Sequence, residues 1–293
     1  MLTLFSTFAV AVRAEPFPKL RIPLGRHVGQ LMPVEVRYYT DPACPRSWGR
    51  EPELRRLMWE FGDGLRFRWV MGGLAREYRA DEYPTLVAEW LELAADTGMP
   101  TDPRAWLHNP IASTYPACQA VNAAAEQGPD AGYAYLRRLR EGLLVERRKL
   151  DHFEALLGEA GLAGLDTERF RIDLASNAII EAFAADLEEV RSNRIALPSA
   201  LFLGEDGLRH GVWGPGPYEA YREAALAAGA DPVAAAPTDA LEVVERFGRV
   251  ATREVEALTG RPRPVVEAEL WSLAREWRLR PAPALTGTLW ERA

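Results

Sequence analysis

The stretch Val34-Glu-Val-Arg-Tyr-Tyr-Thr-Asp-Pro-Ala-Cys44-Pro-Arg-Ser47-Trp48 predicts a strand that leads into a helix. Residues 34–39 are rich in β-branched and aromatic side chains, which favour a buried strand, and Asp41-Pro42 is typical of a turn. From Pro45 onward, apolar residues recur at helical spacing up to Phe61. Cys44 is therefore expected at the N-terminus of a helix.

A thiol in that position has a chemical consequence. The unpaired amides and the dipole of a helix favour an anion at the N-terminus, and the thiolate is the nucleophilic form of cysteine. The sequence therefore predicts that the pKa of Cys44 lies below that of a free cysteine, and that Cys44 is a nucleophile.

Composition sets the outer limits. The 293 residues are 48% hydrophobic and 26% charged, which is ordinary for a globular protein, and the net charge of -7 argues against nucleic-acid binding by the whole chain. Two cysteines do not form a disulfide framework, and no run approaches the roughly 18 apolar residues that span a membrane. Residues 1–33 lack the basic start of a signal peptide, so we expect an N-terminal extension of a cytoplasmic protein.

The chain alternates between α/β and purely helical patterns. Residues 65–71 predict a second strand, parallel to the first. Residues 81–190 show no convincing strand and predict a helical insertion. A strand, a hairpin turn and a closing helix then follow up to residue 228. We predict an N-terminal extension (1–33), an α/β domain (34–80 and 191–228), the insertion (81–190) and a C-terminal winged-helix-like module (238–293).

These features together resemble the thioredoxin-like DsbA family, and more closely its branch of predicted dithiol-disulfide isomerases. That branch includes FrnE-like proteins and the YjbH-type adaptors of the ClpXP protease. The motifs that carry the resemblance are Thr40-Asp-Pro, Cys44, Trp48, 51–56 (Glu-Pro-Glu-Leu-Arg-Arg), 70–74 (Val-Met-Gly-Gly-Leu), 115–118 (Tyr-Pro-Ala-Cys) and 197–199 (Leu-Pro-Ser). The resemblance covers about residues 34–228 and implies a thioredoxin-like fold with a helical insertion.

The resemblance also implies a substrate groove. Thioredoxin-like proteins carry a cis-proline opposite the active-site cysteine, and Pro198 occupies that place. The groove would be formed by Leu197 and Pro198 on one side and by Pro45, Arg46 and Trp48 beside the cysteine.

The chain departs from the family at its second cysteine, which is Ser47 here. A dithiol enzyme resolves the mixed disulfide with that second thiol, and a serine cannot do so. Our main hypothesis is a monothiol thiol-disulfide oxidoreductase or isomerase that acts on disulfide-containing or glutathionylated proteins. Cys44 would be the nucleophile, Ser47 a hydrogen-bond donor to the thiolate, and glutathione a co-substrate.

Three alternatives stay open. Cys118 could supply the second thiol, although it is more typical of a small buried side chain. The site could be vestigial on a protein-binding adaptor whose partners are a regulatory protein and a protease. The fold is also that of kappa-class glutathione transferases and hydroxychromene-carboxylate isomerases, which place a serine where this chain has Cys44.

The remaining features predict no further chemistry. The four histidines, at 27, 108, 152 and 210, lack the spacing of metal ligands, so no metal site is expected. Arginines and glutamates balance one another in residues 238–293, so we expect this module to dock on protein rather than to bind nucleic acid.

Overall fold

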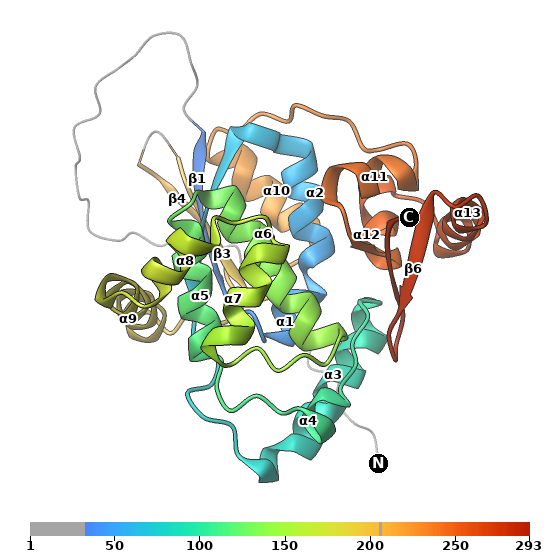
Figure 1. Cartoon of the computed structure of the whole chain (residues 1–293). Helices are drawn as coiled ribbons and strands as arrows, with labels where there is room; N and C mark the ends of the chain where they lie inside the picture. The colour runs from blue at the N-terminus through green and yellow to red at the C-terminus, as the bar shows by residue number, and fades with distance from the viewer. Residues whose placement is uncertain (1–32, 205–206) are drawn as a thin grey trace, which may run out of the picture.

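The computed structural model describes residues 33–204 and 207–293, and a four-stranded sheet lies at its centre (Figure 1). The strands are β1 (Val34–Thr40), β2 (Leu65–Met71), β3 (Ser199–Leu203) and β4 (Arg209–Val212), in the order β2-β1-β3-β4. β1 is parallel to β2 and antiparallel to β3, and β4 is antiparallel to β3. The predicted α/β class with a thioredoxin-like sheet and a helical insertion is confirmed.

The register of the sheet brings two distant motifs to one end of it. Tyr39 of β1 pairs with Ser199 of β3, and Thr40 pairs with Met71 of β2. Pro198 therefore lies opposite the end of β1, where the chain turns toward Cys44. Val36 and Tyr38 face the main core, whereas Tyr39 packs with Val190 on the other face of the sheet.

The helix predicted over residues 45–61 is two helices, α1 (Pro45–Gly49) and α2 (Glu51–Phe61). Arg50 leaves the helical conformation, with φ -102° and ψ 6°. Pro52 follows in the first turn of α2, and a proline has no amide hydrogen with which to continue the ladder from α1. The prediction of one helix was wrong because it relied on the spacing of the apolar residues and did not take account of Pro52.

The region between β2 and β3 is helical, as predicted. α5, α6 and α7 lie in front of the sheet in Figure 1, while Val190 of α9 covers the opposite face. A π-helical turn follows α6. The elements are η2 (Ala80–Glu82), α3 (Tyr83–Thr97), α4 (Ala105–His108), α5 (Tyr115–Ala125), α6 (Pro129–Arg140), η3 (Glu141–Val145), α7 (Phe153–Leu162), α8 (Thr167–Leu174) and α9 (Asn177–Ser192).

The chain after β4 closes the sheet and then forms a second, smaller unit beside α2 (Figure 1). Residues 230–237 run along α2 without helix or strand, and the amides of Val233 and Ala234 donate to the carbonyl of Glu60. The unit has its own core, formed from three helices and a sheet of order β5-β7-β6. Before this unit, α10 (Tyr218–Ala227) packs on the main core. The elements of the unit are α11 (Ala240–Phe247), β5 (Val250–Ala251), α12 (Thr252–Thr259), α13 (Arg263–Arg275), β6 (Leu279–Pro283) and β7 (Thr288–Arg292).

Residues 238–293 contain three helices and a terminal hairpin, as expected, and their likeness to a winged helix stays a prediction. The module is not separate from the rest of the chain, because Ala251 and Leu289 belong to the main hydrophobic core. Two expectations fall on residues that the structure does not describe. The N-terminal extension lies outside the described residues except for Pro33, and so do the central residues 205 and 206 of the predicted turn.

Candidate functional site

Cys44 stands at the start of a helix, as the sequence predicts. It is the N-cap residue of α1, and its carbonyl accepts the first intrahelical hydrogen bond, from the amide of Trp48 at 3.1 Å. The Sγ atom accepts from the amide of Ser47 at 3.5 Å. The side chain thus occupies the anion position of the helix, although α1 is only five residues long.

The predicted low pKa of Cys44 is wrong. The residue is only 3% exposed, and burial raises the pKa of its thiol above the ordinary value. The amide and hydroxyl of Ser47 lower the pKa, but by less than burial raises it. The thiol is therefore protonated at neutral pH, because transfer of a charge out of water outweighs what a short helix and one serine supply.

Ser47 is itself completely buried. Its Oγ atom makes no hydrogen bond of good geometry with any described residue. The hydroxyl therefore has capacity to donate to a thiolate at Cys44, but nothing in this position can act as a second thiol.

Asp41 is the polar centre of the site, whereas sequence reasoning placed it in a turn and in the Thr40-Asp-Pro motif and gave it no role in the site. Its carboxylate is buried and accepts four hydrogen bonds: from the amides of Ala43 and Leu74 at 2.8 and 2.7 Å, from the Thr114 hydroxyl at 2.8 Å and from the Cys118 thiol at 3.3 Å. Burial raises the pKa of Asp41, and these four donors partly oppose the rise. Full burial of an Asp-Pro turn cannot be read from the sequence.

Tyr78, in the chain segment after β2, is partly buried against the main core. Burial raises the pKa of Tyr78, and the charge of Asp41 raises it further. The Tyr78 ring meets the ring of Trp106 edge-on, with centroids 4.8 Å apart. Sequence reasoning assigned no role to Tyr78.

The peptide bond between Leu197 and Pro198 is cis, as the resemblance implies. Pro198 is buried, and Leu197 is partly buried against the backbone of Gly72, where even a Cβ atom would lie 2.6 Å from the Leu197 side chain. The side chain of Leu197 therefore packs inward onto Gly72.

The other predicted groove residues differ in their exposure to solvent. Pro45 is partly exposed and Arg46 is exposed, so both are available to a partner. Trp48 is not, because it is completely buried, donates from Nε1 to the carbonyl of Pro100 at 2.8 Å and lies 4.5 Å beneath the guanidinium of Arg137. The prediction that Trp48 shapes a substrate groove is corrected, since its helical position directs it into the core.

A buried network of charges lies behind this site. Arg140 donates to Glu51 and to the hydroxyl of Thr40, the last residue of β1. Burial pushes the pKa of Glu51 up, but Arg140, Arg137 and Arg55 outweigh it, so the pKa lies below its usual value. The network thus holds Glu51 ionised at the start of α2.

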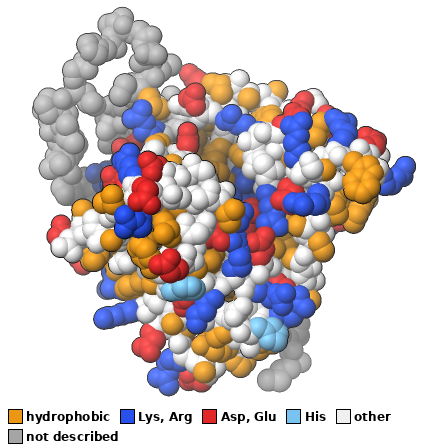
Figure 2. Space-filling model, in the orientation of Figure 1, with side chains coloured by type: hydrophobic (Ala, Val, Ile, Leu, Met, Phe, Trp, Pro, Cys, Tyr) orange, Lys and Arg blue, Asp and Glu red, His pale blue; other side chains and the backbone are white. Residues whose placement is uncertain are grey.

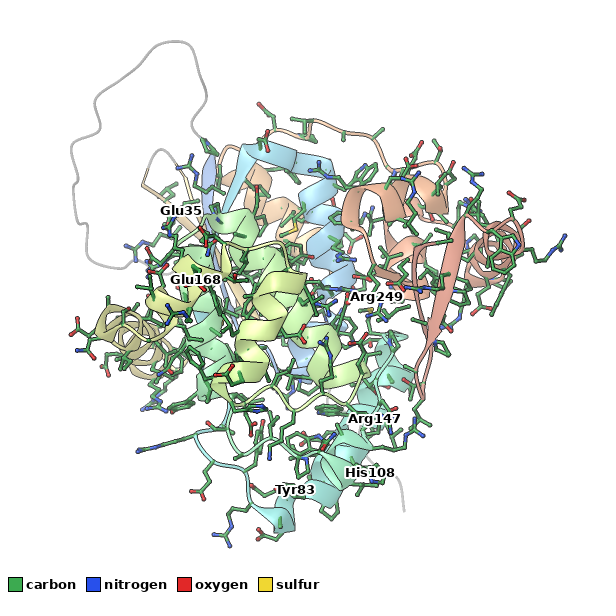
Figure 3. The ribbon with its side chains drawn as sticks, in the orientation of Figure 1. Glu35, Tyr83, His108, Arg147, Glu168 and Arg249 are labelled. Carbon is green, nitrogen blue, oxygen red and sulfur yellow. The ribbon has the colours of Figure 1, made fainter. Side chains whose placement is uncertain are left out.

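The same network fixes the C-terminal module. Arg137 binds Glu254 of the module through two nitrogens, at 2.6 and 3.1 Å, and also pairs with Glu141 at 2.6 Å. Arg55 donates to the carbonyl of Arg249 at 2.9 Å. Arg249 lies where α6 and the module face each other (Figure 3). The insertion, α2 and the module therefore share their buried charges.

Within residues 33–204 and 207–293, no group of three or more His, Cys, Asp or Glu side chains could hold a metal ion. The same residues include no helix that is both long and apolar enough to cross a bilayer.

Comparison with known proteins agrees with this architecture. The family model described as thioredoxin matches residues 38–222. Two curated relatives are the ClpXP adapter protein SpxH of Halalkalibacterium halodurans, 29% identical over 272 residues and 88% of each chain, and that of Bacillus subtilis, 28% identical over 266 residues, 88% of this chain and 89% of its own. Both alignments are longer than residues 38–222, so they extend beyond the thioredoxin-like part.

Solved structures share the fold over a smaller part of the chain. The cytosolic disulfide reductase DsbM from Pseudomonas aeruginosa has a TM-score of 0.55 and 22% identity, covering 66% of this chain and 98% of its own. The same reductase with GSH gives a TM-score of 0.53 and 21% identity, over 66% of this chain and 99% of its own. With its sheet, its cis-proline and a family model that spans well over half of its length, the chain belongs to the thioredoxin family.

Proposed function

We propose that this chain is a protein-binding adaptor of the protease-adaptor type, whose thioredoxin fold supplies a surface rather than a catalytic cycle. The observation that carries the proposal is the state of the cysteine site. Cys44 is buried and its pKa is raised, and a buried serine stands where a resolving thiol is needed. A disulfide-exchange enzyme needs an accessible thiolate.

The C-terminal module supports the same proposal. The curated relatives, which are ClpXP adapters by name, align over 88% of this chain, whereas the disulfide reductase aligns over 66%. The module is bonded to α2 and α6 through Arg55, Arg137 and Glu254. We infer that it works with the thioredoxin domain as one binding unit, in the cytoplasm, and that its partners are a regulatory protein and a ClpXP-type protease.

The test compares protein turnover in the native host. We expect deletion of the gene for this chain and deletion of the protease to stabilise the same regulatory protein, and Cys44→Ser to restore turnover as well as the wild type does. If the two deletions share no stabilised protein, the adaptor function fails. If the wild type restores turnover and Cys44→Ser does not, thiol chemistry is needed.

A monothiol activity is the second candidate, because the Ser47 amide points at Sγ and the cis-Pro198 bond is kept. In that cycle the Cys44 thiolate attacks a glutathionylated protein and takes up the glutathionyl group, and the protein leaves as a thiolate. A second glutathione thiolate then attacks this mixed disulfide, forms oxidised glutathione and restores Cys44. A glutathione adduct on Cys44 in Cys118→Ala protein would favour this candidate.

A further inference from the structure

The outer side of α13 and the residues just after it carry large apolar side chains that are exposed to solvent. Trp277 is 86% exposed, Trp271 53% and Val265 49%. Exposed arginines, Arg275 and Arg278, lie directly beside them. We call Trp271, Arg275, Trp277 and Arg278 the α13 face. Figure 2 shows orange side chains next to blue ones at the right of the view, where Figure 1 places α13.

Helical geometry separates this face from the core of the module. Val266, Leu270 and Leu273 point inward and are buried. Residues 264, 268, 271 and 275 are spaced at intervals of four, three and four, so they form one stripe on the opposite side. Every residue of that stripe is exposed.

Trp277 occupies a backbone position that disfavours it. The Arg278 amide donates to the carbonyl of Leu273 at 3.0 Å, and the Trp277 amide to that of Ala274 at 3.1 Å. These two bonds form a Schellman motif with Trp277 at the position that usually holds glycine, and its φ is +58°. A tryptophan there opposes folding and leaves its ring in water, so stability does not explain its presence.

The face is pre-organised for contact. Trp271 meets the buried ring of Trp290 edge-on, with centroids 4.9 Å apart and an interplanar angle of 85°. Trp290 is in turn fixed by a hydrogen bond from its Nε1 to the Thr252 hydroxyl at 2.9 Å. Binding at this face would therefore require little ordering of Trp271.

The charges indicate what the face binds. Arg275 makes no ion pair with any described residue, and the nearest approach of Arg278 to a carboxylate is 3.9 Å, to Glu276. A second copy of the chain is disfavoured, because a two-fold contact would bring these arginines together. Duplex DNA is disfavoured, because tryptophan replaces polar base-reading residues at the centre of the face.

We propose that the α13 face binds an acidic amphipathic helix of a partner protein, with Trp271 and Trp277 against its apolar stripe and Arg275 and Arg278 against its carboxylates. This inference rests on the proposed adaptor function and names a surface for it. Tryptophan and arginine are the residues that most often dominate protein interfaces, and helix recognition through an apolar stripe is common.

The experiment titrates the full chain with a synthetic amphipathic helix of about 18 residues, with leucines on one face and glutamates on both flanks. A second peptide has lysine for each glutamate. Isothermal calorimetry and tryptophan fluorescence report binding.

We expect the acidic peptide alone to bind, more weakly at high salt. We expect Trp271→Ala and Trp277→Gly to weaken it at least tenfold, and Arg275→Gln to reduce its salt dependence. Trp213→Ala, at an exposed tryptophan outside the module, is the matched control.

Trp277→Gly keeps the test independent of folding. Glycine fits the left-handed position, so this variant should unfold at a higher urea concentration than the wild type while losing the peptide. The proposal is overturned if the acidic peptide does not bind, if both peptides bind alike, if the tryptophan substitutions leave binding unchanged, or if duplex DNA binds through Arg275.

The turnover assay of the proposed function, run on Trp277→Gly, separates the two ideas. Unchanged turnover would show that the adaptor acts through another surface. Turnover of the regulatory protein could instead prove independent of this protein while the acidic peptide still binds the wild type at the α13 face. In that case the adaptor function fails, and the proposal that the α13 face binds an acidic helix is upheld.

Discussion

The Cys118 thiol donates a hydrogen bond to Oδ2 of Asp41 over 3.3 Å, so Cys118 is tied to the turn that precedes Cys44. Burial raises the pKa of Cys118 well above its ordinary value, and the charge and hydrogen bond of Asp41 raise it further. Cys118 therefore acts as a hydrogen-bond donor to a buried carboxylate. That role differs from the purely apolar one that its helical face suggests, and it makes Cys118 a poor attacking thiol.

Replacement of Asp41 by alanine should destabilise the fold. Four donors would lose their common acceptor: the amides of Ala43 and Leu74, the hydroxyl of Thr114 and the thiol of Cys118. We expect a loss of roughly 3 kcal/mol in the free energy of unfolding, measured in urea. Asp81→Ala, at an exposed residue, should change it by less than about 0.5 kcal/mol. An equal effect of both substitutions would contradict the central role of Asp41.

Alkylation of Cys44 should be slow at neutral pH. Burial raises its pKa, so the thiolate is scarce until the pH exceeds the ordinary value of about 8.5. The measurement is the rate of iodoacetamide labelling against pH in Cys118→Ala protein, read by mass spectrometry. The same chain in urea serves as control and should label faster. A midpoint well below about 8.5 would restore the original prediction of an activated thiol.

Acid should weaken the fold through Glu51. Its pKa is lowered in the folded state, so its stabilising contribution is present above the unfolded-state pKa of about 4.3 and is lost as the pH falls through the folded value. The raised pKa of Asp41 acts in the opposite direction, since its protonation favours the folded state. We therefore compare Glu51→Gln with wild type. The difference in unfolding free energy should be about 3–5 kcal/mol at neutral pH and shrink toward pH 3.

Glu168→Gln is the control for that comparison. Glu168 is exposed, and Arg171, one turn away, is its only ionic partner among the described residues. Its removal should therefore change stability by less than about 0.5 kcal/mol at any pH. A difference between Glu51→Gln and wild type that stayed constant on acidification would mean that Glu51 is not held ionised.

Removal of residues 238–293 should prevent stable folding of what remains. Arg55 and Arg137 would lose Glu254, and the main core would lose Ala251 and Leu289. We expect an aggregated or rapidly proteolysed product, because an unpaired buried charge is strongly destabilising. Glu254→Gln, which keeps the shape of the module, should lower the melting temperature without abolishing folding. A truncated chain as stable as the intact one would show that the module is independent.

The sequence predicts the sheet well because its signals are local. Residues 34–39 and 65–71 carry strand composition, and Pro198 precedes a strand directly, so these parts of the fold follow from neighbouring residues. The break between α1 and α2 at Arg50 and the burial of Cys44 do not follow from neighbouring residues. The burial of Cys44 is not visible in the residues next to it, and Trp48 is buried beneath Arg137, which lies far along the chain.

The charge network shows the same limit. In the sequence, Arg137 and Arg140 belong to a helix that contains several arginines. No neighbouring residue indicates that Glu254 pairs with Arg137 or that Glu51 pairs with Arg140. The domain boundaries at 80, 190 and 228 stay a prediction, because the hydrophobic and ionic contacts cross them.

The position of β1 has a consequence for synthesis of the protein. β1 pairs with β2, which follows it closely in the sequence, but its other edge pairs with β3. During synthesis Glu35 therefore has no strand partner on that edge until Leu203 has been added. At about 5–20 residues per second, the intervening helices keep that edge open on the ribosome for on the order of ten seconds. A nascent chain with an exposed central strand is prone to aggregate. Its yield in the cell should therefore depend on chaperones that bind the growing chain.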